Sequence, residues 1–129
     1  MGIQSSPVCP LCEQDQESTQ HLFFECNVAA KIWQQILKWQ GIKRVVLGWN
    51  EEISWTVSNA NGKRGKAEIY RMTLSGSIYY VWLERNLKLL QNKRRPEDVI
   101  TKMIIQDVHC RGSKLPRLTK QMASLNFYP

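Results

Sequence analysis

Apolar residues recur every three or four positions in three segments of the chain, which is the spacing of a buried helix face. The first segment predicts a helix from residue 27 to residue 40, which Asn27 can cap and Gly41 can end. The second predicts a long, largely buried helix from residue 67 to residue 92. Trp33 and Trp82 lie in these apolar stripes, so we expect both in the core.

The third segment follows a break at Lys93-Arg94-Arg95-Pro96 and predicts a helix that runs to Cys110. Two helices joined by so short a basic turn should pack antiparallel as a hairpin. Gly76 interrupts the earlier helix between two serines, and such a position allows another helix to pack closely. Glu84 and Lys88 stand four apart in the favourable order, which predicts a solvent-facing ion pair.

The connection between the first two of these helices is less regular. Val45-Val46-Leu47 fits either a short strand or a buried link, and the sequence leaves both open. Asn50 can cap a brief helix in which Glu51 and Glu52 favour the positive end of the helix dipole. The segment from residue 59 to residue 66 holds two glycines and a single alanine as its apolar residue, so it predicts a loop.

Three of the four cysteines lie near the start of the chain, in the order Cys9, Cys12, His21 and Cys26. A Cys-x-x-Cys turn points two sulfurs to the same side, and a second pair returning from a short loop can close a tetrahedron around zinc. Thiolates and one imidazole suit this borderline-soft ion. Four protein ligands leave no open position, so we expect one structural zinc ion.

The same cysteines and histidine could also serve three roles that involve no zinc. A disulfide framework suits a secreted chain, but three clustered cysteines are an odd number and the apolar core of a secretory signal is missing. A redox Cys-x-x-Cys normally opens a helix after a strand, and the proline-rich start predicts no such strand. In the third interpretation, the cysteines are buried thiols that share no common site. The spacing of all four residues together favours zinc.

The segment from Cys9 to Trp33 resembles the zinc-binding domain found after the polymerase of plant non-LTR (LINE-type) retrotransposon reverse transcriptases. A looser likeness continues through residues 78–86 and 100–110. The likeness rests on the following residues: Cys9-Pro10-Leu11-Cys12, Glu17-Ser18-Thr19, His21-Leu22-Phe23-Phe24-Glu25-Cys26 and Ala29-Ala30-Lys31-Ile32-Trp33.

The resemblance implies zinc ligation by Cys9, Cys12, His21 and Cys26, and a role in holding RNA or DNA. The sequence contains no polymerase-like region and no Tyr-x-Asp-Asp motif, so reverse transcription does not carry over. The most economical interpretation is a stand-alone fragment of such an element, or a host gene derived from one.

The formal net charge is +7, and the charge is unevenly distributed. Residues 1–41 hold two bases and four acids, whereas the remainder holds sixteen bases and seven acids. Positive charge therefore lies away from the cysteines, where it favours phosphate backbones or acidic surfaces. The candidate nucleic-acid contacts are the bases of the predicted loop and of the predicted hairpin turn: Lys63, Arg64, Lys66, Lys93, Arg94 and Arg95.

No pattern in the sequence predicts catalysis. His109 and Cys110 are neighbours on a helix and diverge, and Glu97, Asp98 and Asp107 form no recognisable acid cluster. A glycine-rich phosphate loop and a serine nucleophile elbow are also missing from the sequence. We therefore expect a nucleic-acid-binding module rather than an enzyme, with no small-molecule substrate. The alternative is a protein-interaction adaptor in which zinc only stabilises the fold.

These patterns together predict a mainly α protein, in which a small zinc-knuckle-like finger of the CCHC type packs on a helical domain with a long hairpin. The expected divisions are the finger with its following helix at 1–40, a helical domain at 41–112, and a basic, partly disordered tail at 113–129. No apolar run reaches the length of a membrane span, and we expect an intracellular protein, nuclear or cytoplasmic. The start fits the loose myristoylation pattern at Gly2, which needs a second signal for firm anchoring.

Overall fold

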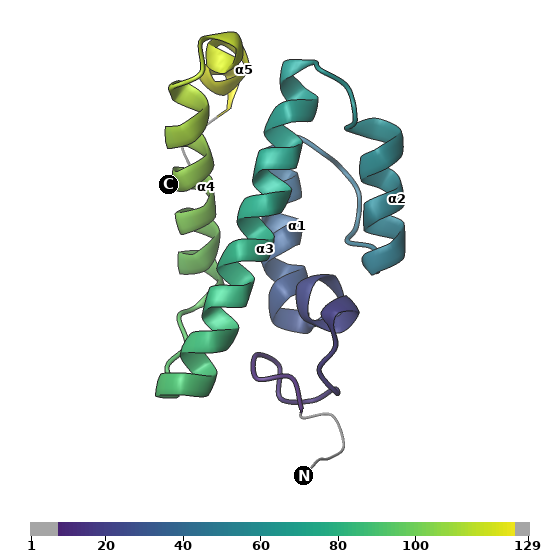
Figure 1. Ribbon diagram of the computed structural model, residues 1–129, viewed down its shortest axis with the longest axis vertical. Helices are drawn as coiled ribbons and strands as arrows, with labels where there is room; N and C mark the ends of the chain where they lie inside the picture. The colour runs from purple at the N-terminus through teal and green to yellow at the C-terminus, as the bar shows by residue number, and fades with distance from the viewer. Residues whose placement is uncertain (1–7, 126–129) are drawn as a thin grey trace.

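Helices joined by short connections make up the chain in a computed structural model that describes residues 8–125 (Figure 1). Within that range the only β-type pairing is an isolated antiparallel bridge between Val8 and Gln16. The mainly α prediction is therefore confirmed. The elements in chain order are the π-helical turn η1 (His21–Glu25), α1 (Asn27–Trp39), α2 (Trp49–Asn59), α3 (Gly65–Gln91), α4 (Glu97–Ser113), the 3-10 turn η2 (Pro116–Leu118) and α5 (Thr119–Ser124).

The predicted hairpin is present. Figure 1 shows α3 and α4 side by side and running in opposite directions, and α1 packs against both of them. Their buried faces form the core, because apolar side chains at helical spacing turn inward on all three helices. Gly76 of α3 faces α4, since a Cβ at Gly76 would lie 3.8 Å from Val108 and 3.9 Å from Ile104. The core residues that are fully or almost fully buried include Ile32, Trp33, Ile36, Leu37, Ile69, Tyr70, Ile100, Ile104, Ile105 and Val108.

A buried carboxylate fastens α2 to the rest of the molecule. Glu52 is 0% exposed, and its oxygens accept hydrogen bonds from Arg44 at 2.9 Å, from the Trp33 indole at 3.1 Å and from the Leu47 backbone at 2.8 Å. Arg44 also lies over the ring of Trp55, 4.4 Å from its centroid. Both oxygens of the carboxylate are therefore satisfied away from water, which is the condition for burying a charge.

The predicted ion pair between Glu84 and Lys88 is wrong. Glu84 is 0% exposed and pairs with Arg95 of the hairpin turn, whose Nη2 lies 2.8 Å from Glu84 Oε1. Lys88 instead pairs with Glu13 at 3.2 Å. The expectation that Trp82 lies in the core is also wrong, because its side chain remains 48% exposed. A wide apolar face on a 27-residue helix is more than two neighbouring helices cover.

The connector and the tail also differ from their expectations. Val45-Val46-Leu47 is neither a strand nor a buried link, and Val45 is 71% exposed. After α4, where little regular pattern was expected, η2 and α5 fold back so that Leu118 and Met122 are buried. A Cβ at Gly112 would overlap the Met122 side chain, which shows how closely α5 lies against α4.

Residues 126–129 of the tail and the myristoylation pattern at Gly2 lie outside the described residues. The division of the chain at residues 40 and 112 stays a prediction. In the described range, none of the helices combines the length and the apolar character needed to span a bilayer.

Replacing Glu52 by alanine should lower the free energy of unfolding by about 3–5 kcal/mol, because the partly buried Arg44 and the buried Trp33 N–H would lose their acceptor. Urea unfolding followed by circular dichroism measures the change. Glu51→Ala, at the exposed neighbouring position of the same helix, is the matched control and should change stability by at most about 0.5 kcal/mol. Equal effects of the two variants would contradict the anchoring role of Glu52.

Candidate metal centre

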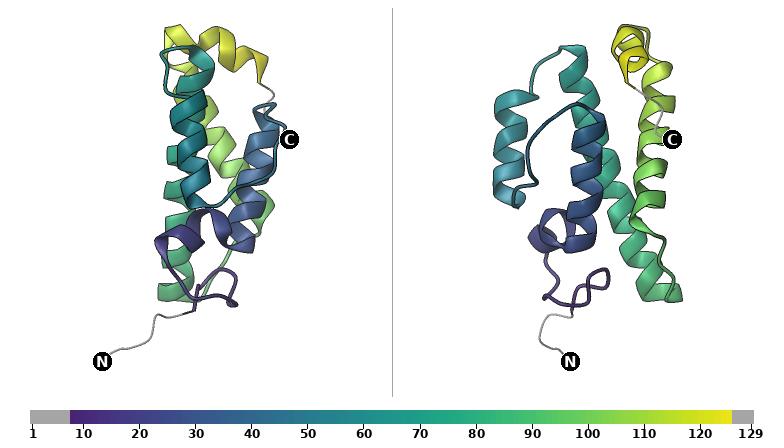
Figure 2. Two further views of the ribbon diagram at one scale, coloured as in Figure 1. Left: turned by 90° about the vertical axis from the view of Figure 1, so that its right-hand side faces the viewer. Right: turned by 180° about the vertical axis from the view of Figure 1, so that it is seen from behind.

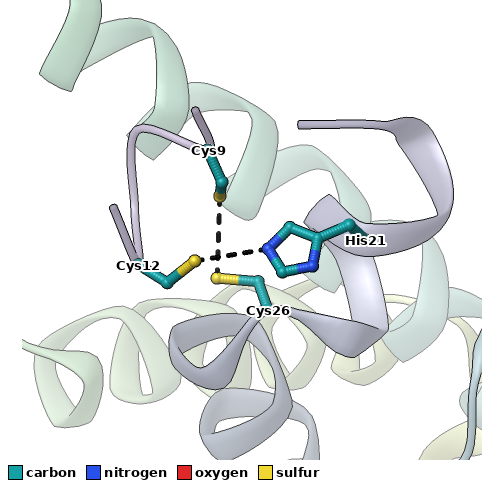
Figure 3. A group of neighbouring side chains, drawn as sticks. All are labelled: Cys9, Cys12, His21 and Cys26. Carbon is teal, nitrogen blue, oxygen red and sulfur yellow. Dashed lines mark hydrogen bonds between the residues drawn. The ribbon is translucent and has the colours of Figure 1, made fainter. Parts of the chain in front are cut away.

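The first two predicted ligands lie in a tight turn between Cys9 and Cys12. The N–H of Cys9 donates to the Asp15 carbonyl at 2.8 Å, and the N–H of Glu13 donates to the Cys9 carbonyl at 2.9 Å. Glu13 closes the turn in the left-handed region, with φ of 59°. This backbone conformation directs the two thiols to the same side of the turn, as the Cys-x-x-Cys spacing predicts (Figure 3).

The other two predicted ligands lie at the two ends of the π-helical turn η1. The N–H of Cys26 donates to the carbonyl of His21 at 2.6 Å, which closes the wider turn. Ser18 precedes this turn, and its hydroxyl accepts a hydrogen bond from the His21 N–H at 3.0 Å. Nothing in the sequence pattern predicts the π-helical turn, and such turns occur frequently at functional sites.

The four side chains converge on one point. Figure 3 shows the thiols of Cys9, Cys12 and Cys26 and the imidazole of His21 turned toward one another. Their donor atoms all lie within 4.8 Å of one another. The sulfurs of Cys9 and Cys26 are 3.8 Å apart, and the Cys12 sulfur is 3.3 Å from Nε2 of His21. Cys9 and Cys26 are fully buried, His21 is nearly so, and Cys12 is partly exposed.

This donor set fits a tetrahedral zinc ion. With zinc–sulfur bonds of about 2.3 Å and zinc–nitrogen bonds of about 2.0–2.1 Å, a tetrahedron requires about 3.8 Å between sulfurs and about 3.5 Å between sulfur and nitrogen. The Cys9–Cys26 and Cys12–His21 separations are close to these values, and in Figure 3 the two dashed lines cross as opposite edges of a tetrahedron do. The group could hold one metal ion.

Burial shapes the chemistry of the thiols. Burial raises the pKa of Cys26 to about 12, although the N–H of Ala29 opposes it, and burial also raises the pKa of Cys9. Burial acts in the same direction on Cys12, but the backbone N–H groups of Asp15 and Gln14, together with His21, outweigh it and lower its pKa to about 7. A cation held by the group would stabilise all three thiolates, since a coordinating thiol is deprotonated.

Residues 1–33 match the family model described as zinc-binding in reverse transcriptase. This segment is therefore similar to the zinc-binding domain of reverse transcriptases. The match ends at Trp33, so it does not extend to the looser likeness over residues 78–86 and 100–110. No curated protein and no solved structure matches the chain.

Ion pairs and aromatic contacts attach the zinc-binding domain to the helices. Arg85 of α3 forms a bidentate pair with Glu17, with Nη2 of Arg85 2.9 Å from Glu17 Oε1. Phe24 of η1 packs on the rings of Trp33 and Trp49, with centroids 5.9 and 5.6 Å away. Phe24 is 2% exposed, so this apolar residue between the ligands fastens the finger to α1.

The six candidate nucleic-acid contacts do not form one surface. Lys63, Arg64 and Lys66 are exposed at the start of α3, whereas Lys93-Arg94-Arg95 lie just beyond its other end. A helix rises about 1.5 Å per residue, so the two groups are about 40 Å apart. Arg95 is held by the buried Glu84, and Arg94 pairs with Glu97, so the turn carries less available charge than its sequence indicates.

Purified protein should contain one zinc ion per chain, and His21→Ala and Cys26→Ser should each lose it, because each removes one of four converging donors. Elemental mass spectrometry measures the content. Cys110→Ser is the matched control, since this exposed cysteine lies outside the group and should leave the zinc content unchanged. Zinc retained in both ligand variants would contradict the assignment.

Chelation of zinc should unfold residues 8–26 and leave α1, α3 and α4 largely helical, because the first segment has few backbone hydrogen bonds of its own while the helices share a core. Hydrogen exchange should rise in residues 8–26 while the helical circular dichroism signal is mostly kept. Readdition of zinc restores the protection. Loss of the whole helical signal would instead mean that the core depends on the metal.

Proposed function

We propose that this protein is a zinc-dependent nucleic-acid-binding module without polymerase activity or any other enzymatic activity. The observation that carries the proposal is the reverse transcriptase zinc-binding domain at residues 1–33, whose four converging donors fit zinc. Enzymes of that class act on RNA and DNA, so a domain joined to them is suited to holding their substrate. The net charge of +7 supports the same partner, because a basic surface attracts phosphate backbones.

The zinc ion has a structural role in this proposal. Cys9, Cys12, His21 and Cys26 would supply all four ligands, and two of the thiols are fully buried, so substrate has no open coordination position. When bound, zinc would cross-link the Cys9–Cys12 turn to η1. Reduced cysteines of this kind are typical of the interior of the cell, in the nucleus or cytoplasm. An origin in a plant LINE-type element is part of the same proposal.

A protein-interaction adaptor is the second candidate, and one observation favours it. The second half of α3 exposes several large apolar side chains in the part of the chain that the structure describes: Tyr79, Trp82, Leu89 and Leu90. Exposed apolar side chains that cluster often mark a protein interface. In this alternative, zinc only stabilises the fold and nucleic-acid affinity at physiological salt is negligible.

Zinc-loaded protein should bind mixed-sequence RNA or DNA with an affinity that falls steeply as the salt concentration rises, because the contacts are made mainly to phosphates. Fluorescence anisotropy with labelled single-stranded RNA and duplex DNA, titrated at several salt concentrations, measures the affinity and its salt slope. His21→Ala should weaken binding and Cys110→Ser should not. Absence of binding even at low salt would reject the proposal and favour the adaptor.

A further inference from the structure

Cations from three separate stretches of the chain meet at the end of the helical bundle that lies away from the metal centre. The C-terminal end of α1, the start of α3 and the helix α5 lie toward this end, while the hairpin turn and the Cys9–Cys12 turn lie at the opposite one (Figures 1 and 2). We name this region the basic end. Its cations are Lys38, Lys43, Lys63, Arg64, Lys66, Lys114, Arg117 and Lys120.

Contacts between these stretches place them side by side. One cleft is lined by residues 39–42 at the end of α1, by Lys66 and Ile69 of α3, and by residues 124–125 at the end of α5. A Cβ at Gly65 would overlap the Gln121 side chain, so the first turn of α3 lies directly against α5. Arg117 and Glu68 add an ion pair across the same contact, with Arg117 Nε 2.9 Å from Glu68 Oε1. Tertiary packing therefore joins charges that are far apart in the sequence.

Most of the charge at the basic end is available to a ligand. Arg117 is paired with Glu68, while the other seven cations are exposed and have no ion-pair partner in residues 8–125. Elsewhere in this range the acids take up much of the positive charge. Arg44 pairs with Glu52, and the pairs Arg85–Glu17, Lys88–Glu13 and Arg95–Glu84 neutralise the bases near the metal centre and the hairpin turn. The field that a polyanion meets is therefore concentrated at the basic end.

We propose that the basic end binds the phosphodiester backbone of RNA or DNA, and that the hairpin turn and the zinc-binding domain do not supply the main phosphate contacts. This inference rests on the proposed function and says where on the molecule that function lies. Six of the seven available cations are lysines, which act as point charges toward phosphate oxygens. The exposed aromatic side chains Tyr79 and Trp82 lie on the second half of α3, so the basic end should bind without base preference.

A membrane surface fits the basic end less well. Helices that bind bilayers expose an apolar face next to their basic residues. In α5 the large apolar residue Met122 and the adjoining Leu118 are buried in the core, and the exposed positions are Thr119, Lys120, Ala123 and Ser124. The helix α5 therefore offers charge without an exposed apolar face, which matches a nucleic-acid backbone better than a lipid surface.

The test compares three sets of variants of the full, zinc-loaded chain. The first set changes Lys63, Arg64 and Lys66 together to alanine, and the second changes Lys114 and Lys120, so that either one tests the basic end if the other folds poorly. The matched control changes Lys93 and Arg94 at the opposite end of α3. Anisotropy with labelled single-stranded RNA and with duplex DNA is measured over a range of salt concentrations, and phosphatidylserine vesicles are tested in parallel.

The triple variant should weaken binding to both nucleic acids on the order of tenfold at about 0.15 M salt and should lower the salt slope by about 2 to 3, since each lost phosphate contact removes about one. The double variant at Lys114 and Lys120 should show a smaller change in the same direction. The Lys93 and Arg94 control should stay within about twofold of the unaltered protein, because a loss of about one contact or less is expected there.

Two results would overturn the inference while leaving the proposed function standing. One is wild-type binding that neither basic-end variant weakens, and the other is a loss of affinity in the control as large as in the triple variant. Stronger binding to the vesicles than to either nucleic acid would also overturn it, in favour of a lipid surface. A wild-type protein that binds neither nucleic acid at low salt would reject the proposed function itself.

Discussion

The arrangement of the other elements depends on the contacts that the indole ring of Trp33 makes. Its ring packs on Phe24 between the metal ligands and on Tyr70 of α3, and its N–H donates to the buried Glu52 of α2. One side chain on α1 therefore touches the metal centre, the long hairpin and the α2 segment. A buried carboxylate must keep its donors, and a buried indole N–H must keep its acceptor. Neither partner can therefore move without leaving the other buried and without a hydrogen bond.

The metal centre and the helical bundle support each other through a second set of contacts. The ligands come from two short stretches that have little apolar core of their own, and the bidentate pair between Arg85 and Glu17 joins them to α3. Near the metal centre, Arg85 and Lys88 are both neutralised by ion pairs of this kind. Glu13 and Glu17 dock the finger on α3 through these pairs, and this leaves less positive charge available near the centre than at the far end of the bundle.

Much of the fold and the centre of the candidate site were predictable because they depend on local spacing. Helix periodicity marks α1, α3 and α4 closely, and the order of Cys9, Cys12, His21 and Cys26 predicts the group whose donor atoms converge. Long-range partners were not predictable in the same way. The sequence predicts Glu84 in solvent beside Lys88, but Glu84 is fully buried and pairs with Arg95 of the hairpin turn. The helix α5 was missed because it is short and buries only Leu118 and Met122 with its preceding turn.

The sequence by itself determined the helical class, the hairpin, and which four residues gather around one point, because each follows from a period or a spacing within a short stretch. Only the tertiary structure decided which charges remain available. Six candidate bases look equivalent in the sequence, yet packing neutralises Arg95 through Glu84 and places Lys63, Arg64 and Lys66 beside α5. Electrostatic interactions depend on distance in space and on burial, and neither can be read from the order of residues alone.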